Sequence, residues 1–305
     1  MQPYHYLTTT GGLIWTAVCV LAGIGCTWLV YRIINKVPAA WLCDYNETPS
    51  AELLSGQRVK FTGSGIIVSI LAVAALISCR LQFNKGYDIY FVVFALIIMI
   101  ALMIAICDIK YTIIPDQFTI ALAVLGLLIS IYDLVRGFGL LHTTWWSPIA
   151  GAALGGGAML LIDFIGMLIY KRTGMGFGDV KLFAAIGLIT GFPGTILTLV
   201  LSLITGTIGF CGILLVNRIR SRSQGEEEAV KVDVPSETPT SAITETSETP
   251  TSAVTEAPAA EEESSEQEEE RGYLAFGPYI ALALIAYLSL YDLIYYLVGL
   301  YLKLF

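Results

Sequence analysis

Two aspartates stand at the ends of apolar segments, where an ionisable side chain is costly and therefore suggests a function. Asp108 closes the segment 88–107, and Asp179 opens the segment 180–191. If the two helices meet, the carboxylates can share one water. Repulsion between them then leaves one carboxylate ionised as a base and the other protonated as an acid, the arrangement of an aspartic protease. The two aspartates are therefore a candidate acid–base pair.

Three glycines, Gly174, Gly176 and Gly178, precede Asp179. Glycine allows positive φ and close backbone approach, so the loop can turn sharply into a helix and leave room for an extended peptide beside the carboxylate. The same run also fits a flexible turn whose aspartate caps the helix and favours its positive dipole end. The glycine motif alone therefore leaves both interpretations open.

Other carboxylates have simple structural alternatives. Asp108 by itself could be a boundary carboxylate paired with Lys110 or Lys181. Asp163, about two turns from the end of the segment 148–169, is either a third catalytic carboxylate or a structural hydrogen-bond acceptor. These alternatives depend on which helices come together.

The composition excludes an ordinary soluble enzyme. Of 305 residues, 56% are hydrophobic and 14% charged, and the mean hydropathy is +0.73. We predict an all-α, polytopic membrane helix bundle with about eight spans. The predicted spans are 11–31, 65–83, 88–107, 117–134, 148–169, 180–191, 194–216 and 276–302.

Glycines also predict how some spans pack. Gly151 and the run 155–157 are expected to allow close helix packing. The segment 180–191 is too short to cross a bilayer unaided, so it should be packed inside the bundle or continued by the turn at 191–194.

Basic residues in the short loops predict the orientation. If the N-terminus is outside, twelve Lys and Arg residues lie on one side and four on the other. The positive-inside rule then places both termini outside and the richer loops in the cytoplasm. Asp108 and Asp179 would share one cytoplasmic boundary. The predicted cytoplasmic loops are 32–64, 108–116, 170–179 and 217–273.

The last of these loops is strongly acidic. Residues 226–270 hold 15 acidic residues and one Lys, which gives this segment a net charge of −14. Because the whole chain has a net charge of −8, the remaining residues carry +6. We predict a disordered, solvated loop, with a docking tail for a basic partner as the alternative. The sequence therefore predicts a division of the chain into four parts: a first span with a short cytoplasmic loop (1–64), a membrane core (65–223), the acidic linker (224–272) and a last span (273–305).

Three motifs in order resemble the type IV prepilin leader peptidases, which are membrane aspartic peptidases of the Gly-x-Gly-Asp class. The motifs are Asp108-x6-Pro115-Asp116, the run 174–187 and Phe276-Gly277-Pro278-Tyr279. The resemblance covers about 88–216 and 274–290. It implies Asp108 and Asp179 as the catalytic residues. The supporting positions are Gly174, Gly176, Gly178, Lys181, Pro115 and Asp116.

The resemblance also implies the substrate and location. It implies a multi-pass protein of the inner (plasma) membrane that removes the basic leader from prepilins or pseudopilins of a pilin, secretion or competence system. The substrate carries a Gly before the cut and a hydrophobic helix in the bilayer after it. The expected partners are these substrates and membrane lipid, with no nucleic acid.

Pro115 and Asp116 are expected to begin the fourth helix, with Asp116 capping its amides.

No cofactor or metal site is predicted. Longer members of the resembling family have two Cys-x-x-Cys pairs and an N-methyltransferase activity associated with the first cytoplasmic loop. Here that loop, 32–64, has only Cys43, and tetrahedral zinc needs four ligands, so methylation is doubtful. His5 and His142 are isolated and external in the predicted topology, and neither suggests a metal site.

Two other functions are compatible with some of these residues. A proton- or cation-coupled transporter could use Asp108, Asp163 and Asp179, but the sequence lacks an obvious duplicated half, and its carboxylates lie at one face rather than the midplane. The related archaeal preflagellin peptidases are a second possibility, but the extra N-terminal spans favour the prepilin branch.

Overall fold

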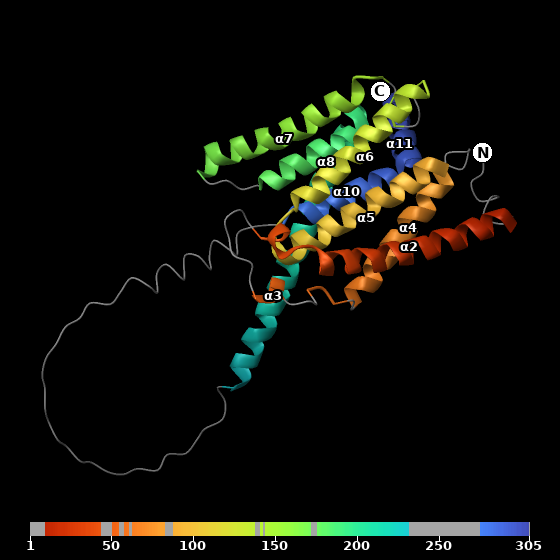
Figure 1. Ribbon diagram of the computed structural model, residues 1–305. Coiled ribbons are helices and arrows are strands. Elements are labelled where there is room, and N and C mark those ends of the chain that lie inside the picture. The colour runs from red at the N-terminus through yellow and green to blue at the C-terminus, as the bar shows by residue number, and fades with distance from the viewer. Residues whose placement is uncertain are drawn as a thin grey trace, which may run out of the picture. The chain divides into compact units, whose positions relative to one another are not determined.

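The computed structural model describes residues 10–43, 51–54, 58–60, 63–82, 88–137, 141–142, 144–171, 176–231 and 275–304. Every regular element in these ranges is a helix (Figure 1), which confirms the all-α prediction. Six of them are long and apolar enough to cross a membrane. These six are α2 (Thr10–Lys36), α4 (Gly63–Gln82), α5 (Asp88–Tyr111), α6 (Asp116–Val135), α7 (Ser147–Tyr170) and α8 (Phe177–Lys231).

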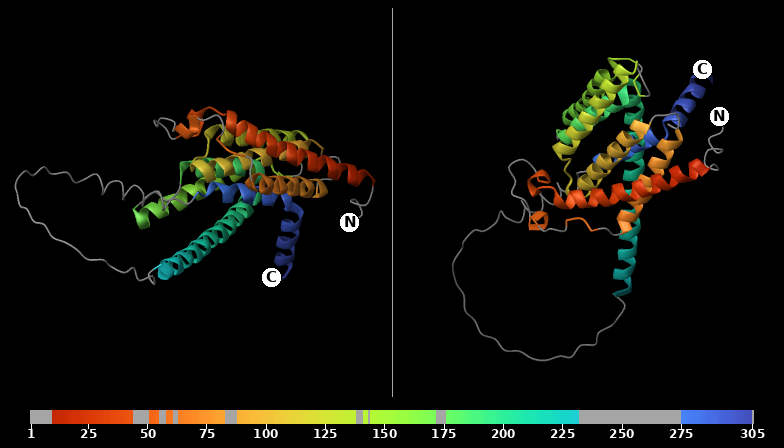
Figure 2. Two further views of the ribbon diagram at one scale, coloured as in Figure 1. Left: turned by 90° about the horizontal axis from the view of Figure 1, so that it is seen from below. Right: turned by 45° about the vertical axis from the view of Figure 1, so that its right-hand side comes forward.

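Four shorter elements complete the described fold: η1 (Ala39–Trp41), α3 (Ala51–Leu54), α10 (Gly277–Ser289) and α11 (Tyr291–Leu304). Helix α5 is the most apolar and lies at the centre, in contact with α2, α4, α6 and α10. A helix that is apolar all round must be buried, and Phe94, Ile97 and Ile104 are fully enclosed. Figure 1 shows α10 lying along α5, and Figure 2 shows α2 and α4 packed on the same group of helices.

The sixth and seventh predicted spans form the two limbs of α8, which reverses direction at Gly191. This residue has φ 67° and ψ 179°, a conformation that glycine adopts without a steric penalty. Contacts with α10 give the direction of the second limb. Gly194 packs against Tyr287 near the end of α10, whereas Gly206 packs against Phe276 at its beginning. The second limb is therefore antiparallel to α10, and the predicted turn at 191–194 is confirmed.

The first limb of α8 packs closely on α7 through glycine. Gly151 of α7 touches the backbone of Gly187, and Gly155 lies against the carbonyl oxygen of Phe183. A side chain at either α7 position would separate the helices, so the predicted packing role is confirmed there. Gly157 faces open space and plays no part in it. The short predicted span is thus held inside the bundle.

The prediction of one continuous last span is wrong, because this segment breaks at Leu290. Helix α10 has 13 residues, or roughly 20 Å, which is shorter than the hydrocarbon core of a bilayer. The backbone carbonyl groups at the end of α10, which lack partners within the helix, have side-chain partners instead. Ser78 donates to the carbonyl of Ser289, and the Cys79 thiol lies 3.6 Å from the carbonyl of Leu288. Side chains of α4 therefore stabilise the break.

The chain separates into two compact units, one formed by Met1–Thr207 with Ala275–Phe305 and the other by Ile208–Leu274. Within the second unit, α8 continues to Lys231 and so includes the first residues of the predicted acidic linker. The rest of the linker lies outside the described residues. The four-part division drawn from the sequence stays a prediction.

Candidate active site

Asp108 occupies the last turn of α5 and is only 3% exposed. The backbone N–H of Gly277, the first residue of α10, donates a 2.9 Å hydrogen bond to its Oδ2 atom. Gly277 touches the carboxylate so closely that a Cβ atom there would lie 2.7 Å from Oδ2. The beginning of α10 therefore fixes the orientation of Asp108. The sequence alone did not indicate this role of Gly277, although the residue lies in one of the three motifs.

Asp179 is the third residue of α8 and is also 3% exposed. Its backbone N–H donates to the carbonyl of Gly176 at 3.0 Å. Its Oδ1 atom is buried and has no hydrogen-bond partner among the described residues. Asp108 and Asp179 lie close enough for their carboxylates to interact electrostatically. The structure thus brings together the two aspartates that the sequence singled out.

Two carboxylates placed in this way are able to activate a water molecule. The carboxylates come from helices far apart in the sequence and meet in a protected position at one end of the bundle. Two neighbouring carboxylates avoid carrying two negative charges, so one retains a proton while the other is ionised. A water molecule between them could be deprotonated by one and its product protonated by the other. Among the described residues, no group of three or more His, Cys, Asp or Glu side chains could hold a metal ion.

Gly178, the residue before Asp179, acts through close approach. Gly178 does not have positive φ, so the expectation of left-handed backbone is wrong at this position. A Cβ atom at Gly178 would lie 3.1 Å from Cβ of Ile114, which belongs to the connection between α5 and α6. Gly178 therefore lets this connection pass beside the beginning of α8. Gly174 lies outside the described residues.

Asp116 and Lys181 join α6 to α8. The Nζ atom of Lys181 lies 2.8 Å from both carboxylate oxygens of Asp116. Pro115, and not Asp116, occupies the N-cap position of α6, so the predicted capping by Asp116 is wrong. Lys110 donates to the carbonyl of Arg58. The alternative in which Asp108 is neutralised by one of these lysines is therefore not supported.

Asp163 is half-buried in α7, and its Oδ1 atom has no hydrogen-bond partner in the described part of the chain. The predicted structural hydrogen bond is not formed at this oxygen. Asp163 is also not among the groups that act electrostatically on Asp108 or Asp179. The structure therefore gives it no place in the aspartate pair.

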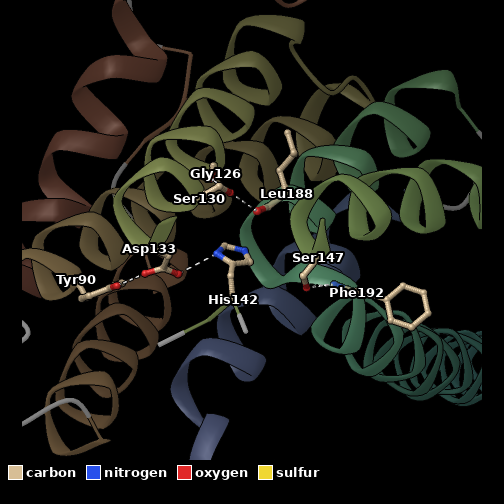
Figure 3. Close-up of polar contacts among 8 residues, drawn as sticks. All are labelled: Tyr90, Gly126, Ser130, Asp133, His142, Ser147, Leu188 and Phe192. Carbon is tan, nitrogen blue, oxygen red and sulfur yellow. Dashed lines mark hydrogen bonds and ion pairs between the residues drawn. The ribbon is translucent and has the colours of Figure 1, made fainter. Parts of the chain in front are cut away.

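A second buried polar cluster lies around the other ends of α5 and α6 (Figure 3). Asp133 accepts a hydrogen bond from Tyr90 on one oxygen, and its other oxygen lies 2.9 Å from Nδ1 of His142. All three residues are at most 3% exposed. The prediction of an isolated, external His142 is therefore wrong. A signal was present in the sequence, since Asp133 interrupts the end of an apolar span.

The contacts of this cluster give it a structural role at the reversal of α8. Gly191 packs against His142 and Ser147, and the Ser147 hydroxyl accepts the N–H of Phe192 at 3.0 Å (Figure 3). A Cβ atom at Gly191 would lie 2.6 Å from the Ser147 Oγ atom. The polar cluster therefore holds the connection before α7 against the reversal of α8.

We expect Asp133→Leu to lower the free energy of unfolding by about 2 kcal/mol, because Tyr90 and His142 would lose a buried acceptor. Thermal unfolding of the purified protein in detergent would measure the change. The folded fraction should keep the activity proposed below, since Tyr90 and Asp108 are separated by roughly 27 Å along α5. An unchanged melting temperature would contradict the structural role of the cluster.

Comparisons with known proteins point to one family. Residues 93–211 match the type IV leader peptidase family. The chain is 23% identical to a prepilin leader peptidase/N-methyltransferase of Myxococcus xanthus strain DK1622 over 248 residues, which covers 74% of this chain and 71% of that protein. It is 27% identical to the protein of that name in Escherichia coli K12 over 175 residues, which covers 56% of this chain and 70% of that protein. A third, from Stutzerimonas stutzeri, is 31% identical over 107 residues, which covers 35% of each chain. No solved structure matches.

Proposed function

We propose that this chain, whose residues 93–211 are a type IV leader peptidase domain, is a membrane aspartic endopeptidase that removes the leader from prepilins or pseudopilins. The observation that carries the proposal is the meeting of Asp108 and Asp179, two buried carboxylates on different helices. The relatives named prepilin leader peptidase support the substrate class. Neither observation favours the transporter hypothesis.

The mechanism follows from the chemistry of the pair. The ionised aspartate accepts a proton from a water molecule, and the oxygen of that water attacks the scissile carbonyl carbon. The protonated aspartate donates its proton to the developing oxyanion. The aspartate that accepted the proton of water then donates it to the leaving amine as the carbon–nitrogen bond breaks, and the other aspartate recovers its proton from the tetrahedral intermediate. Asp179 Oδ1 has no hydrogen-bond partner among the described residues and is the available acceptor for the water. Asp108 Oδ2 is held by Gly277.

The proposed location is the cytoplasmic boundary of the inner membrane. Six helices are apolar and long enough to cross a membrane. Asp108 lies at the end of one of these spans and Asp179 at the beginning of another. The excess of Lys and Arg in the loops on this side supports a cytoplasmic orientation. A substrate with a hydrophobic helix could then lie in the bilayer and present its basic leader to the pair.

A second activity is not proposed, although the relatives' names include N-methyltransferase. The first loop has Cys43 but no Cys-x-x-Cys pair. The zinc site associated with methylation in the longer family members would need four ligands, which this loop does not supply. We therefore restrict the proposed function to peptide cleavage.

Coexpression with candidate prepilins tests the proposal directly. Cleavage should appear on a gel as loss of the short leader, and mass spectrometry of the product should place the cut after the leader glycine. A prepilin with that glycine replaced by valine should remain uncleaved. If no prepilin or pseudopilin is shortened by the wild-type chain in membranes, the proposed substrate class is wrong.

Cleavage should not depend on a metal ion or on a thiol. We expect Cys107→Ala to cleave a prepilin at the wild-type rate in the presence of a chelator, because a carboxylate pair needs neither group. Cys107 adjoins Asp108 and is fully buried, so alanine is a smaller substitute that cannot obstruct the pair. The measurement is the rate of leader loss in detergent. If chelation stops cleavage, or if this variant is inactive while correctly folded, the aspartic mechanism fails.

The acidic segment should be dispensable for the chemistry. We expect a variant lacking residues 226–270 to insert into the membrane and to cleave at the wild-type rate, since the segment carries little apolar surface and none of the three motifs. Cleavage assays in membranes and in detergent would test this. Loss of activity in both would show that the segment is structural. A slower reaction only in membranes would support docking of a basic partner.

A further inference from the structure

An open groove lies at the C-terminal end of α2, where the candidate span Gly12–Lys36 ends. Its volume is about 390 Å³. Two cationic side chains and several apolar ones line it. The lining includes Arg32, Lys36, Leu29, Ile33, Val37 and Trp41. The groove is thus basic at the membrane boundary and apolar beside it.

Hydrogen bonds tie this end of α2 to the C-terminal end of α5. Arg58 donates to the carbonyl of Val37, and Lys110 of α5 donates to the carbonyl of Arg58. Asn35 and Val59 exchange two hydrogen bonds, of 3.0 Å and 2.8 Å. These contacts fix the chain around the groove before any ligand binds, so little ordering cost remains for binding.

The two cations have no carboxylate partner in the part of the chain that the structure describes. Arg32 and Lys36 are both exposed and lie one helical turn apart. The Arg32 guanidinium stands 5.0 Å from the centre of the Trp28 ring. This cation–π contact restrains Arg32 but leaves its N–H donors available for an anion.

The apolar wall of the groove continues along α2. Leu21, Ile24 and Trp28 follow at helical spacing and are 71%, 52% and 58% exposed. In a membrane, such a face is covered by acyl chains. Tryptophan and basic residues at the end of a span belong at the level of the lipid headgroups. The groove therefore joins a path for acyl chains to a pair of unneutralised cations.

We infer that this groove binds an anionic phospholipid, with the phosphate against Arg32 and Lys36 and an acyl chain along Leu21 and Ile24. Basic pockets of this kind at the ends of spans select anionic over zwitterionic headgroups. A free phosphate would use the cations but leave the apolar wall uncovered. The acidic segment 226–270 matches the charge but has few apolar side chains. The lipid fits both halves of the groove.

Native mass spectrometry of the full chain in detergent would test this inference. We expect phosphatidylglycerol to be retained roughly 25-fold more strongly than phosphatidylcholine by the wild type, one factor for each of the two cations. The double variant Arg32→Gln/Lys36→Gln should lose this preference, because each basic contact contributes roughly a factor of five. The charge-preserving variant Arg32→Lys/Lys36→Arg should retain it. Equal melting temperatures would show that the variants are folded.

A matched control removes the same charge elsewhere. Lys60→Gln/Arg136→Gln replaces two exposed cations outside the groove, and Arg136 is also placed over an aromatic ring, that of Tyr132. This variant should keep the preference for phosphatidylglycerol. The inference is overturned if the control and the groove variant lose the preference equally, or if the groove variant keeps it.

Two further measurements distinguish the phospholipid from a free phosphate ion and from the acidic segment. Inorganic phosphate at millimolar concentration should not displace phosphatidylglycerol. Deletion of residues 226–270 should leave the lipid preference unchanged. Displacement by phosphate would assign the site to a free anion, and a tenfold gain in lipid retention after the deletion would assign it to the acidic segment. Either outcome would contradict the lipid assignment.

Discussion

Asp108→Asn and Asp179→Asn are each expected to reduce prepilin cleavage by roughly 10³-fold or more, because either change leaves the pair without its acid or its base. Asparagine preserves the size of the side chain and the possibility of accepting the hydrogen bond from Gly277. The fold should therefore survive, while the pair can no longer both deprotonate water and protonate the oxyanion. Leader loss measured against time, at equal amounts of membrane-inserted enzyme, gives the effect. The corresponding alanine variants should be equally inactive.

Asp116 provides the matched control, because it is the other aspartate of the same motif. Its carboxylate forms an ion pair with Lys181, and the two side chains are 30% and 35% exposed. A partly exposed pair contributes about 1 kcal/mol or less to stability. Asp116→Ala should therefore retain measurable cleavage. If Asp116 is essential and Asp108 is dispensable, the assignment within this motif must be reversed.

Gly277→Ala is expected to reduce kcat/KM for prepilin cleavage by about 10²-fold, the size of effect that a displacement of about 1 Å can produce. The new Cβ atom would lie 2.7 Å from Oδ2 and 3.0 Å from Cγ of Asp108, so the carboxylate or the beginning of α10 has to move. The effect should be on kcat rather than on KM, since Gly277 orients Asp108. Steady-state cleavage of a purified prepilin would measure both constants.

Gly157→Ala is the control for this substitution. Gly157 lies in α7 and has open space around its Cβ position, so alanine should leave the cleavage rate unchanged. A normal rate for Gly277→Ala would show that the contact with α10 does not position Asp108. A lowered rate accompanied by an equally lowered melting temperature in both variants would point to a general effect of alanine on the fold.

The spans and the aspartate pair could be predicted from the sequence for a physical reason. A helix in hydrocarbon satisfies its own backbone hydrogen bonds, so the position of each span depends on local apolar composition. An ionised group at membrane depth is expensive, which made Asp108 and Asp179 conspicuous. The pair could be proposed because both aspartates stand at ends of spans that the alternation of loops places on one side.

Contacts between distant residues could not be read in the same way. The break at Leu290 is stabilised by Ser78 and Cys79, more than 200 positions earlier in the chain. Nothing local in the sequence of the last span indicates these partners. The same holds for Asp108 and Gly277, which are 169 positions apart. A polar group reveals in the sequence that it needs a partner, but only the packing of the helices selects that partner.

Asp133 and His142 show most clearly the difference between what the sequence indicates and what the packing of the helices decides. The sequence placed His142 in an outer loop, where an isolated imidazole would be hydrated. The folded chain instead buries it against Asp133, with Tyr90 on the other carboxylate oxygen. Local composition thus determined which segments enter the membrane and which side chains are costly there. Tertiary structure decided which of those side chains meet, because the cost of burying a polar group is offset only by a partner that another helix brings within hydrogen-bonding distance.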